Sequence, residues 1–202
     1  MRIKGIVFDV GGVLIMENYF IIHKKLAKKF NLDEKDFSLV RNKYFMKSTT
    51  INGENFWYEE MISKEFGLDS KKLNEYWINL RRKYFDFNKS VQNFLKNLKG
   101  EEFILASLTN TNYSQEVVRN EIGIYDFFDV NLKSTDLGIH KPNKKIYEIL
   151  VKKLNLSPEE IIFIDDLNYN LEVPKEMGIN TILFKNLKQL KNDLIKLGVG
   201  VK

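Results

Sequence analysis

The chain has 202 residues, of which 44% are hydrophobic and 29% charged, and a formal net charge of +5. This size and composition predict a globular protein with one large domain, or with a core domain and one insertion. Cysteine is absent and only two histidines occur. Disulfides, cysteine nucleophiles and multi-histidine metal sites are therefore excluded. We expect neither a signal peptide nor a membrane span, and hence a cytoplasmic protein.

The positive charge raises the question of nucleic-acid binding. Of the 32 basic residues, however, only five are arginines, whereas base and phosphate recognition favours the arginine fork. The lysines also alternate with acidic residues along helical segments, as on a solvated helix face. We therefore expect no nucleic-acid partner.

Five short apolar runs predict buried strands, at residues 3–8, 103–108, 128–132, 161–164 and 181–184. Segments with helical spacing separate the last four runs, at residues 114–121, 143–154 and 171–177. Apolar strands that alternate with helices indicate a parallel sheet covered on both faces. The expected fold is therefore α/β, with a Rossmann-like parallel sheet of five strands.

The connection after the first strand is much longer than the others. It carries helical patterns at residues 17–30, 33–45, 54–66 and 70–84, and no convincing strand. It also contains 15 of the 26 aromatic residues, enough for a small core of its own. We therefore expect a helical cap domain over residues 16–90 and a core domain over residues 1–15 and 91–202.

Polar residues follow four of the predicted strands: Asp9, Thr109 with Asn110, Lys141, and Asp165 with Asp166. Each group alone has a plainer explanation, such as a turn, a helix cap or a surface lysine. The carboxyl ends of parallel strands meet at one edge of a sheet, however, so three carboxylates would repel one another there. A divalent cation relieves this repulsion, and a cation beside carboxylates and a lysine suggests a phosphate ligand.

The order Asp-x-x-Gly-Val, Thr-Asn, Lys-Pro and Asp-Asp at successive strand ends resembles the haloacid dehalogenase superfamily. The resemblance spans essentially the whole chain, including a helical cap inserted after the first strand. The first motif, Phe-Asp-x-Gly-Gly-Val-Leu, is similar to a branch near the sugar-phosphate phosphatases and the phosphatase domain of epoxide hydrolases. The resemblance implies a magnesium-dependent phosphatase that acts on a small phosphate ester.

In the reaction that this resemblance implies, Asp9 is the nucleophile and forms an aspartyl-phosphate. Thr109, together with the backbone of Asn110, would hold the oxygens of the transferred phosphoryl group. Lys141 would neutralise Asp9 and the phosphate together. Catalysis of this kind depends on positioning and charge neutralisation.

The resemblance also implies a set of ligands for Mg²⁺. Asp9 and Asp166 would bind the ion through their side chains, and Gly11 through its backbone carbonyl. Asp165 would bind the ion or orient a water on it. Gly11 would lie close to the phosphate as well.

Gly11 departs from the pattern, because phosphatases of the family usually carry a second Asp at this position as the general acid. Loss of this acid weakens catalysis more than phosphate binding, since general acid–base help is worth about 10²–10⁴-fold. His140, beside Lys141, is the one nearby group with a suitable pKa to replace the acid, but an ordinary loop histidine is the better explanation.

Three functions follow from these observations. The first is a phosphatase for a small phosphorylated metabolite, a sugar phosphate being expected; the second is a binding or interaction protein that kept the fold and lost its acid. The third is a halo-acid dehalogenase, which needs no metal and so does not explain the Asp165–Asp166 pair. The segment at residues 47–53 is either a substrate-specificity loop or a plain solvent loop, and the oligomeric state cannot be read from the sequence.

Overall fold

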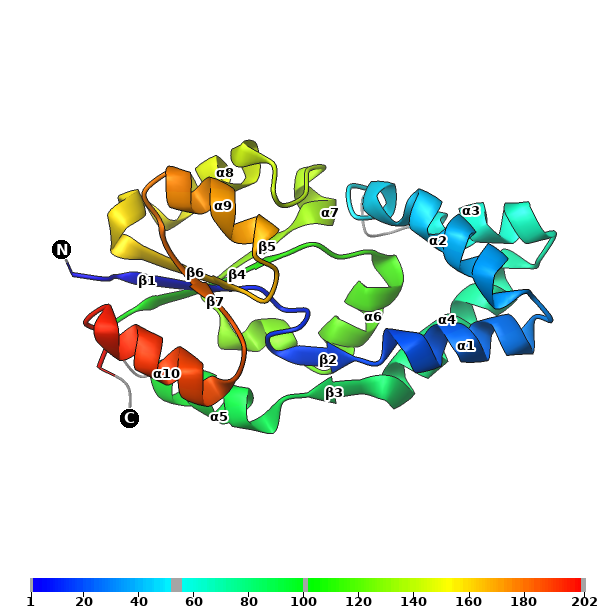
Figure 1. Ribbon diagram of the computed structural model, residues 1–202, viewed down its shortest axis with the longest axis horizontal. Coiled ribbons are helices and arrows are strands. Elements are labelled where there is room, and N and C mark those ends of the chain that lie inside the picture. The colour runs from blue at the N-terminus through cyan, green and yellow to red at the C-terminus, as the bar shows by residue number, and fades with distance from the viewer. Residues whose placement is uncertain (1, 52–55, 100–101, 201–202) are drawn as a thin grey trace.

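A computed structural model describes residues 2–51, 56–99 and 102–200 of the chain. Its main sheet has five parallel strands in the order β5-β4-β1-β6-β7 (Figure 1). These strands are β1 (Gly5–Phe8), β4 (Ile104–Thr109), β5 (Val130–Lys133), β6 (Ile161–Asp165) and β7 (Asn180–Leu183). The predicted α/β fold with a five-stranded parallel sheet is confirmed.

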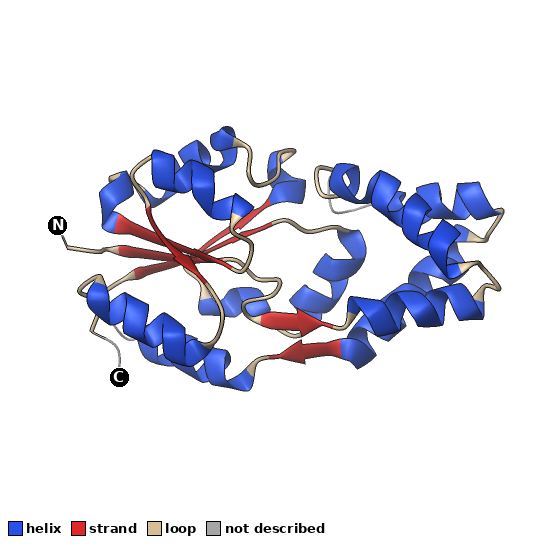
Figure 2. Ribbon diagram, viewed as in Figure 1, coloured by secondary structure: helices blue, strands red, loops and turns tan. Residues whose placement is uncertain are grey.

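Helices cover both faces of this sheet, as Figure 2 shows. On one face lie α5 (Lys89–Leu98) and α10 (Leu187–Lys196), and on the other lie α8 (Lys144–Leu154) and α9 (Tyr169–Glu176). The main body also contains α6 (Tyr113–Glu121) and α7 (Ser134–Leu137). Two short 3₁₀ helices, Ile124–Phe127 and Pro158–Glu160, precede β5 and β6. Among the residues that the structure describes, no helix combines the length and the apolarity that a membrane crossing needs.

Successive residues of β1 point to opposite faces of the sheet and so join two separate cores. Ile6 and Phe8 pack in a cluster with side chains of α5 and α10. Val7 packs in a second cluster with side chains of α8 and α9. All three residues are fully buried. The unbroken apolar run of β1 thus reflects its central position between two helical layers.

The four helices that follow β1 share a third hydrophobic cluster, which contains Trp77, Phe37 and Ile62. These helices are α1 (Tyr19–Lys29), α2 (Glu34–Ser48), α3 (Trp57–Phe66) and α4 (Ser70–Tyr84). They lie together beyond one end of the sheet, and α4 contacts α6 of the main body (Figure 1). The division into a core domain (1–15 and 91–202) and a cap domain (16–90) remains a prediction.

The expectation of no strand within residues 16–90 is wrong. A two-stranded antiparallel ribbon of β2 (Ile15–Glu17) and β3 (Phe85–Phe87) joins the sheet to the four helices. Each strand has only three residues, too few to show the alternation that identifies a strand in a sequence. The ribbon brings the two ends of the helical segment side by side.

His23 of α1 is an unusual polar residue within the aromatic side of these helices. Its ring lies 5.9 Å from the ring centroids of Tyr19 and Trp77 and 6.2 Å from that of Phe37. Burial lowers the pKa of His23 to about 3, and the positive charges of Arg41 and Arg81 add to this effect. The imidazole is therefore neutral in the folded protein at neutral pH.

The neutral state of His23 predicts a specific loss of stability in acid. Below pH 6.5 the unfolded chain binds a proton at His23 that the folded chain does not bind. The free energy of unfolding therefore decreases as the pH is lowered. Between pH 7.5 and 5.5, the parent should lose about 1.4 kcal/mol more than a His23→Phe variant, which keeps the aromatic contacts. Urea unfolding at the two pH values measures this difference. An equal decrease in the free energy of unfolding in the two proteins would contradict the neutral state of His23.

Candidate active site

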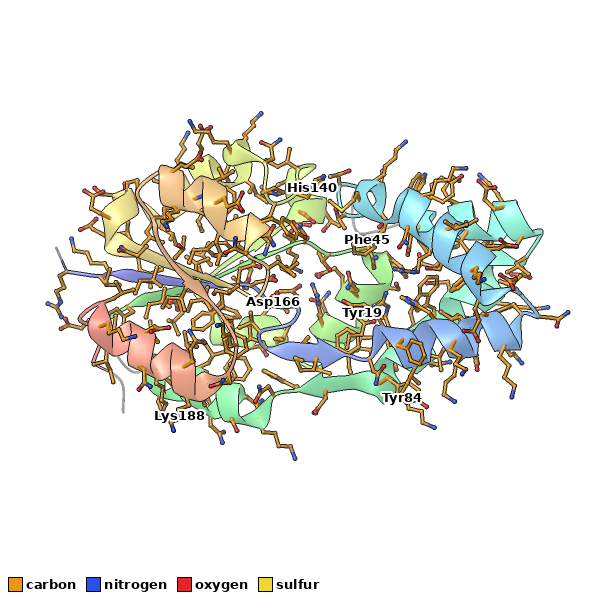
Figure 3. The ribbon with its side chains drawn as sticks, in the orientation of Figure 1. Tyr19, Phe45, Tyr84, His140, Asp166 and Lys188 are labelled. Carbon is orange, nitrogen blue, oxygen red and sulfur yellow. The ribbon has the colours of Figure 1, made fainter. Side chains whose placement is uncertain are left out.

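A cavity of about 550 Å³ opens where the carboxyl edge of the sheet faces α1 and α2. Figure 3 shows Asp166 on the side of the sheet, with Tyr19 and Phe45 on the side of the four helices. The residues of the main body that line the cavity include Asp9, Gly11, Gly12, Asn110, Arg119, Lys141, Asp166 and Asn170. The helical segment contributes Tyr19, His23, Arg41, Phe45, Met46 and Thr49.

Lys141 lies between two carboxylates at the centre of this edge. Its Nζ is 2.6 Å from Asp165 Oδ2 and 3.0 Å from Asp9 Oδ1, and all three side chains are buried. Strands β1 and β6 are neighbours in register, with Phe8 opposite Ile164. The residues that follow this pair, Asp9 and Asp165, therefore lie side by side.

The two buried carboxylates and the ammonium determine one another's ionisation. Burial raises the pKa of Asp9, while the Lys141 charge opposes this rise and the Asp165 charge adds to it. Burial alone would lower the pKa of Lys141, but Asp9 and Asp165 raise it by more. The lysine is consequently a permanent positive charge beside the candidate nucleophile.

Asp166 completes the acidic cluster. Burial, together with the charges of Asp9 and Asp165, raises the pKa of Asp166 to about 6. Its carboxylate lies directly over Gly12, where a Cβ atom would overlap it and where φ is +74°. Gly12 thus allows both the turn after β1 and the close approach of Asp166.

The cluster fits a hard divalent cation. Asp9, Asp165 and Asp166 each present an oxygen atom, and these atoms lie within 4.8 Å of one another. Lys141 forms ion pairs with Asp9 and Asp165, whereas Asp166 forms none with the residues that the structure describes. Carboxylate oxygens are the ligands that Mg²⁺ and Ca²⁺ prefer.

Asp165 differs from the other two carboxylates because neighbouring groups already engage both of its oxygens. Its Oδ1 accepts hydrogen bonds from the backbone N–H of Leu167 at 2.9 Å and from Asn170 Nδ2 at 3.0 Å. Asn170 Nδ2 also lies 3.1 Å from Oδ2, the oxygen that faces Lys141. The geometry therefore suits Asp165 to orienting Lys141. Asn170 was not among the site residues expected from the sequence.

Thr109 is the last residue of β4 and Asn110 follows it, and their side chains have different partners. The Asn110 amide accepts from the backbone N–H of Lys141 at 2.8 Å and donates to its carbonyl at 3.0 Å. Thr109 is fully buried, and its hydroxyl accepts a hydrogen bond from Arg119 Nη1 at 3.1 Å. Asn110 therefore anchors the backbone of Lys141, while Arg119, which the sequence analysis did not identify, covers Thr109.

Two further sequence predictions concerned His140 and residues 47–53. His140 Nδ1 lies 2.9 Å from the carbonyl oxygen of Lys141, and His140 is not among the described residues that line the cavity. Of the segment, Thr49 lines the cavity, whereas residues 52 and 53 lie outside the described part of the chain. Whether the segment selects the substrate remains a prediction.

Comparisons with known sequences identify a family and several relatives. The model of the haloacid dehalogenase-like hydrolase family matches residues 3–178. Flavin mononucleotide hydrolase 1 of Arabidopsis thaliana is 25% identical over 71% of this chain. This chain spans 59% of the length of that protein, and 13% or less of the length of three mammalian relatives. A phosphorylated carbohydrates phosphatase of Thermotoga maritima is 23% identical over 89% of this chain and 83% of its own length.

A solved structure with a similar fold is a haloacid dehalogenase (HAD) family enzyme of Bacteroides thetaiotaomicron in complex with magnesium and inorganic phosphate. It is 22% identical, with a TM-score of 0.76 over 93% of this chain and 98% of its own. This likeness concerns the fold, whereas the family match covers most of the sequence. The chain belongs to the haloacid dehalogenase-like hydrolases.

Proposed function

We propose that this hydrolase is a Mg²⁺-dependent phosphatase that acts on a small phosphate ester through Asp9. The observation that carries the proposal is the cluster of Asp9, Lys141, Asp165 and Asp166, of which all but Asp165 line the cavity. It combines a buried carboxylate nucleophile, a fixed positive charge and a cation-binding group of oxygens, as phosphoryl transfer requires. The relatives named as hydrolases of flavin mononucleotide and phosphorylated carbohydrates support this proposal.

In the proposed reaction, an Asp9 carboxylate oxygen attacks phosphorus and the ester oxygen leaves with its bond electrons. Water then attacks the phosphorus of the aspartyl-phosphate, and the carboxylate of Asp9 is restored as inorganic phosphate departs. Lys141 holds Asp9 in place and offsets the charge of the phosphate, and Asp165 holds Lys141. Asp9, Asp166 and the Gly11 carbonyl would hold a Mg²⁺ ion, which would supply positive charge to the phosphate.

Gly11 restricts the substrates that this reaction accepts. With glycine at this position, the leaving oxygen must take its proton from water or from the substrate itself. The energetic cost is small for a weakly basic leaving group and large for a simple alkoxide. The proposed substrates are therefore phosphates with a weakly basic leaving group, such as aryl phosphate esters, acyl phosphates or anomeric sugar phosphates. An anomeric sugar phosphate agrees with the expectation from the sequence.

The absence of a side chain at Gly11 also favours a second candidate function. A protein that binds a phosphorylated metabolite without turning it over would keep the cation site and the lysine, and would need no general acid. Mg²⁺ and phosphate would then stabilise the protein, and no aryl phosphate would be hydrolysed. The tests of Asp166 and Asp9 below separate the two functions.

Binding of Mg²⁺ should stabilise the folded protein and should require Asp166. The ion binds the native cluster and relieves the repulsion among its carboxylates, so it should raise the melting temperature of the parent by several degrees at saturation. An Asp166→Ala variant should lose this response, whereas an Asp136→Ala variant, which changes an exposed aspartate of α7, should keep it. Thermal unfolding with and without Mg²⁺ measures the effect. A full response in Asp166→Ala would show that the site is wrongly assigned.

Turnover should depend on the carboxylate of Asp9. Asparagine has nearly the same shape but is not a competent nucleophile, so Asp9→Asn should reduce phosphate release from an aryl phosphate by more than about a thousandfold. Circular dichroism should show an unchanged fold. Beryllium fluoride with Mg²⁺ should stabilise the parent and not the variant. Undiminished turnover in Asp9→Asn would exclude the proposed mechanism.

A further inference from the structure

Arg119, in helix α6, presents a charged side chain to the cavity that contains Asp9. It lies in α6, the helix that follows β4, and its side chain is 2% exposed. Nevertheless it is one of the residues that line the cavity with Asp9 and Lys141. Its Nη1 donates to the hydroxyl of Thr109 at 3.1 Å. The guanidinium therefore lies between Thr109, at the end of β4, and the open space of the cavity.

The only ion pair of Arg119 among the described residues, with Glu116, is a long one. Glu116 Oε1 is 3.7 Å from Arg119 Nη1, but the other oxygen of Glu116 is 2.7 Å from Lys133 Nζ. Glu116 also accepts a hydrogen bond from the hydroxyl of Thr111 at 2.7 Å. Lys133 thus already compensates the carboxylate. Among the described residues, the buried Nε of Arg119 has no hydrogen-bond partner.

Arg119 remains charged in this buried position. Burial lowers its pKa, but surrounding groups, among them Glu116 and Asp9, raise it by more. A guanidinium is not a proton donor in proteins, because its pKa lies too far above neutrality. It can donate several hydrogen bonds and offset negative charge, and its fork matches phosphate oxygens.

The guanidinium also covers the place where Gly11 has no side chain. A Cβ atom built on Gly11 would lie 3.4 Å from Arg119 Nη2, with no other heavy atom of a described non-neighbouring residue within 4 Å. The backbone of Gly11 has no positive φ that would require glycine. Gly11, two residues after the nucleophile Asp9, therefore leaves an open space beside it, and Arg119 bounds this space.

We propose that Arg119 binds the phosphate group of the substrate beside Asp9, in the space that Gly11 leaves open. The inference rests on the proposed function, because it assigns a further residue to the same site. Arg119 then acts as a donor of hydrogen bonds and of positive charge, without transferring a proton. It offsets the negative charge on the phosphoryl oxygens as the ester bond breaks, and the leaving oxygen still takes its proton from water or from the substrate.

The affinity for inorganic phosphate in the presence of Mg²⁺ tests this role without relying on turnover. Arg119→Met should bind phosphate about 10–100-fold more weakly than the parent, as expected for loss of hydrogen bonds to a charged group. Arg119→Lys keeps the positive charge but not the forked guanidinium, so its loss of phosphate affinity should be smaller and still measurable. Arg82→Met is the matched control, because it removes an exposed arginine that pairs with Glu121 at 2.6 Å. This control should bind phosphate as the parent does, and titration calorimetry measures all four proteins.

The alternative is that Arg119 serves only to hold α6 against β4. In that case Arg119→Met would unfold at a lower temperature but bind phosphate as tightly as the parent, which would overturn the inference. If Arg119→Met does not fold, Arg119→Lys decides the matter, and an unchanged affinity overturns the inference. A parent and an Arg82→Met control that both fail to bind phosphate with Mg²⁺ would instead overturn the proposed function itself.

Discussion

The ion pairs of Lys141 with Asp9 and Asp165 are the interaction on which the arrangement of the site depends. The two carboxylates follow neighbouring strands of the sheet, and without the ammonium they would be buried like charges. Loss of one partner from such a buried group leaves an uncompensated charge, which costs about 3–5 kcal/mol. Asn110 holds the backbone of Lys141, and Asn170 holds Asp165. These contacts orient the charged groups of the site without a ligand, as electrostatic catalysis requires.

Much of the fold could be predicted from the sequence because its strands are buried on both faces. An apolar run such as residues 161–164 can be recognised without partners, since neither face of the strand meets water. The convergence of Asp9, Lys141, Asp165 and Asp166 also followed from a general rule, namely that the carboxyl ends of parallel strands share one edge. The family itself was indicated by these motifs, and the match over residues 3–178 confirms it.

The features that escaped prediction depend on contacts distant in sequence or on strands too short to carry a pattern. The ribbon of β2 and β3 is stabilised by pairing between residues 15–17 and 85–87, which neither segment reveals alone. Arg119 resembles any arginine on an amphipathic helix, and only the folded structure shows that it bonds to Thr109 and lines the cavity. Gly12 could be recognised as a turn residue, but its contact with Asp166 requires β1 and β6 to be neighbours.

The central position of β1 also determines when the site can assemble during synthesis. Strand β1 leaves the ribosome first, but its partners are residues 104–107 on one side and 161–164 on the other. Contacts of such long sequence separation form late, whereas α1 to α4 find their partners within one contiguous segment. The nascent chain therefore carries an unpaired apolar strand until residues 104–107 and 161–164 have been made. An unpaired apolar strand of this kind makes an incompletely folded chain prone to aggregation.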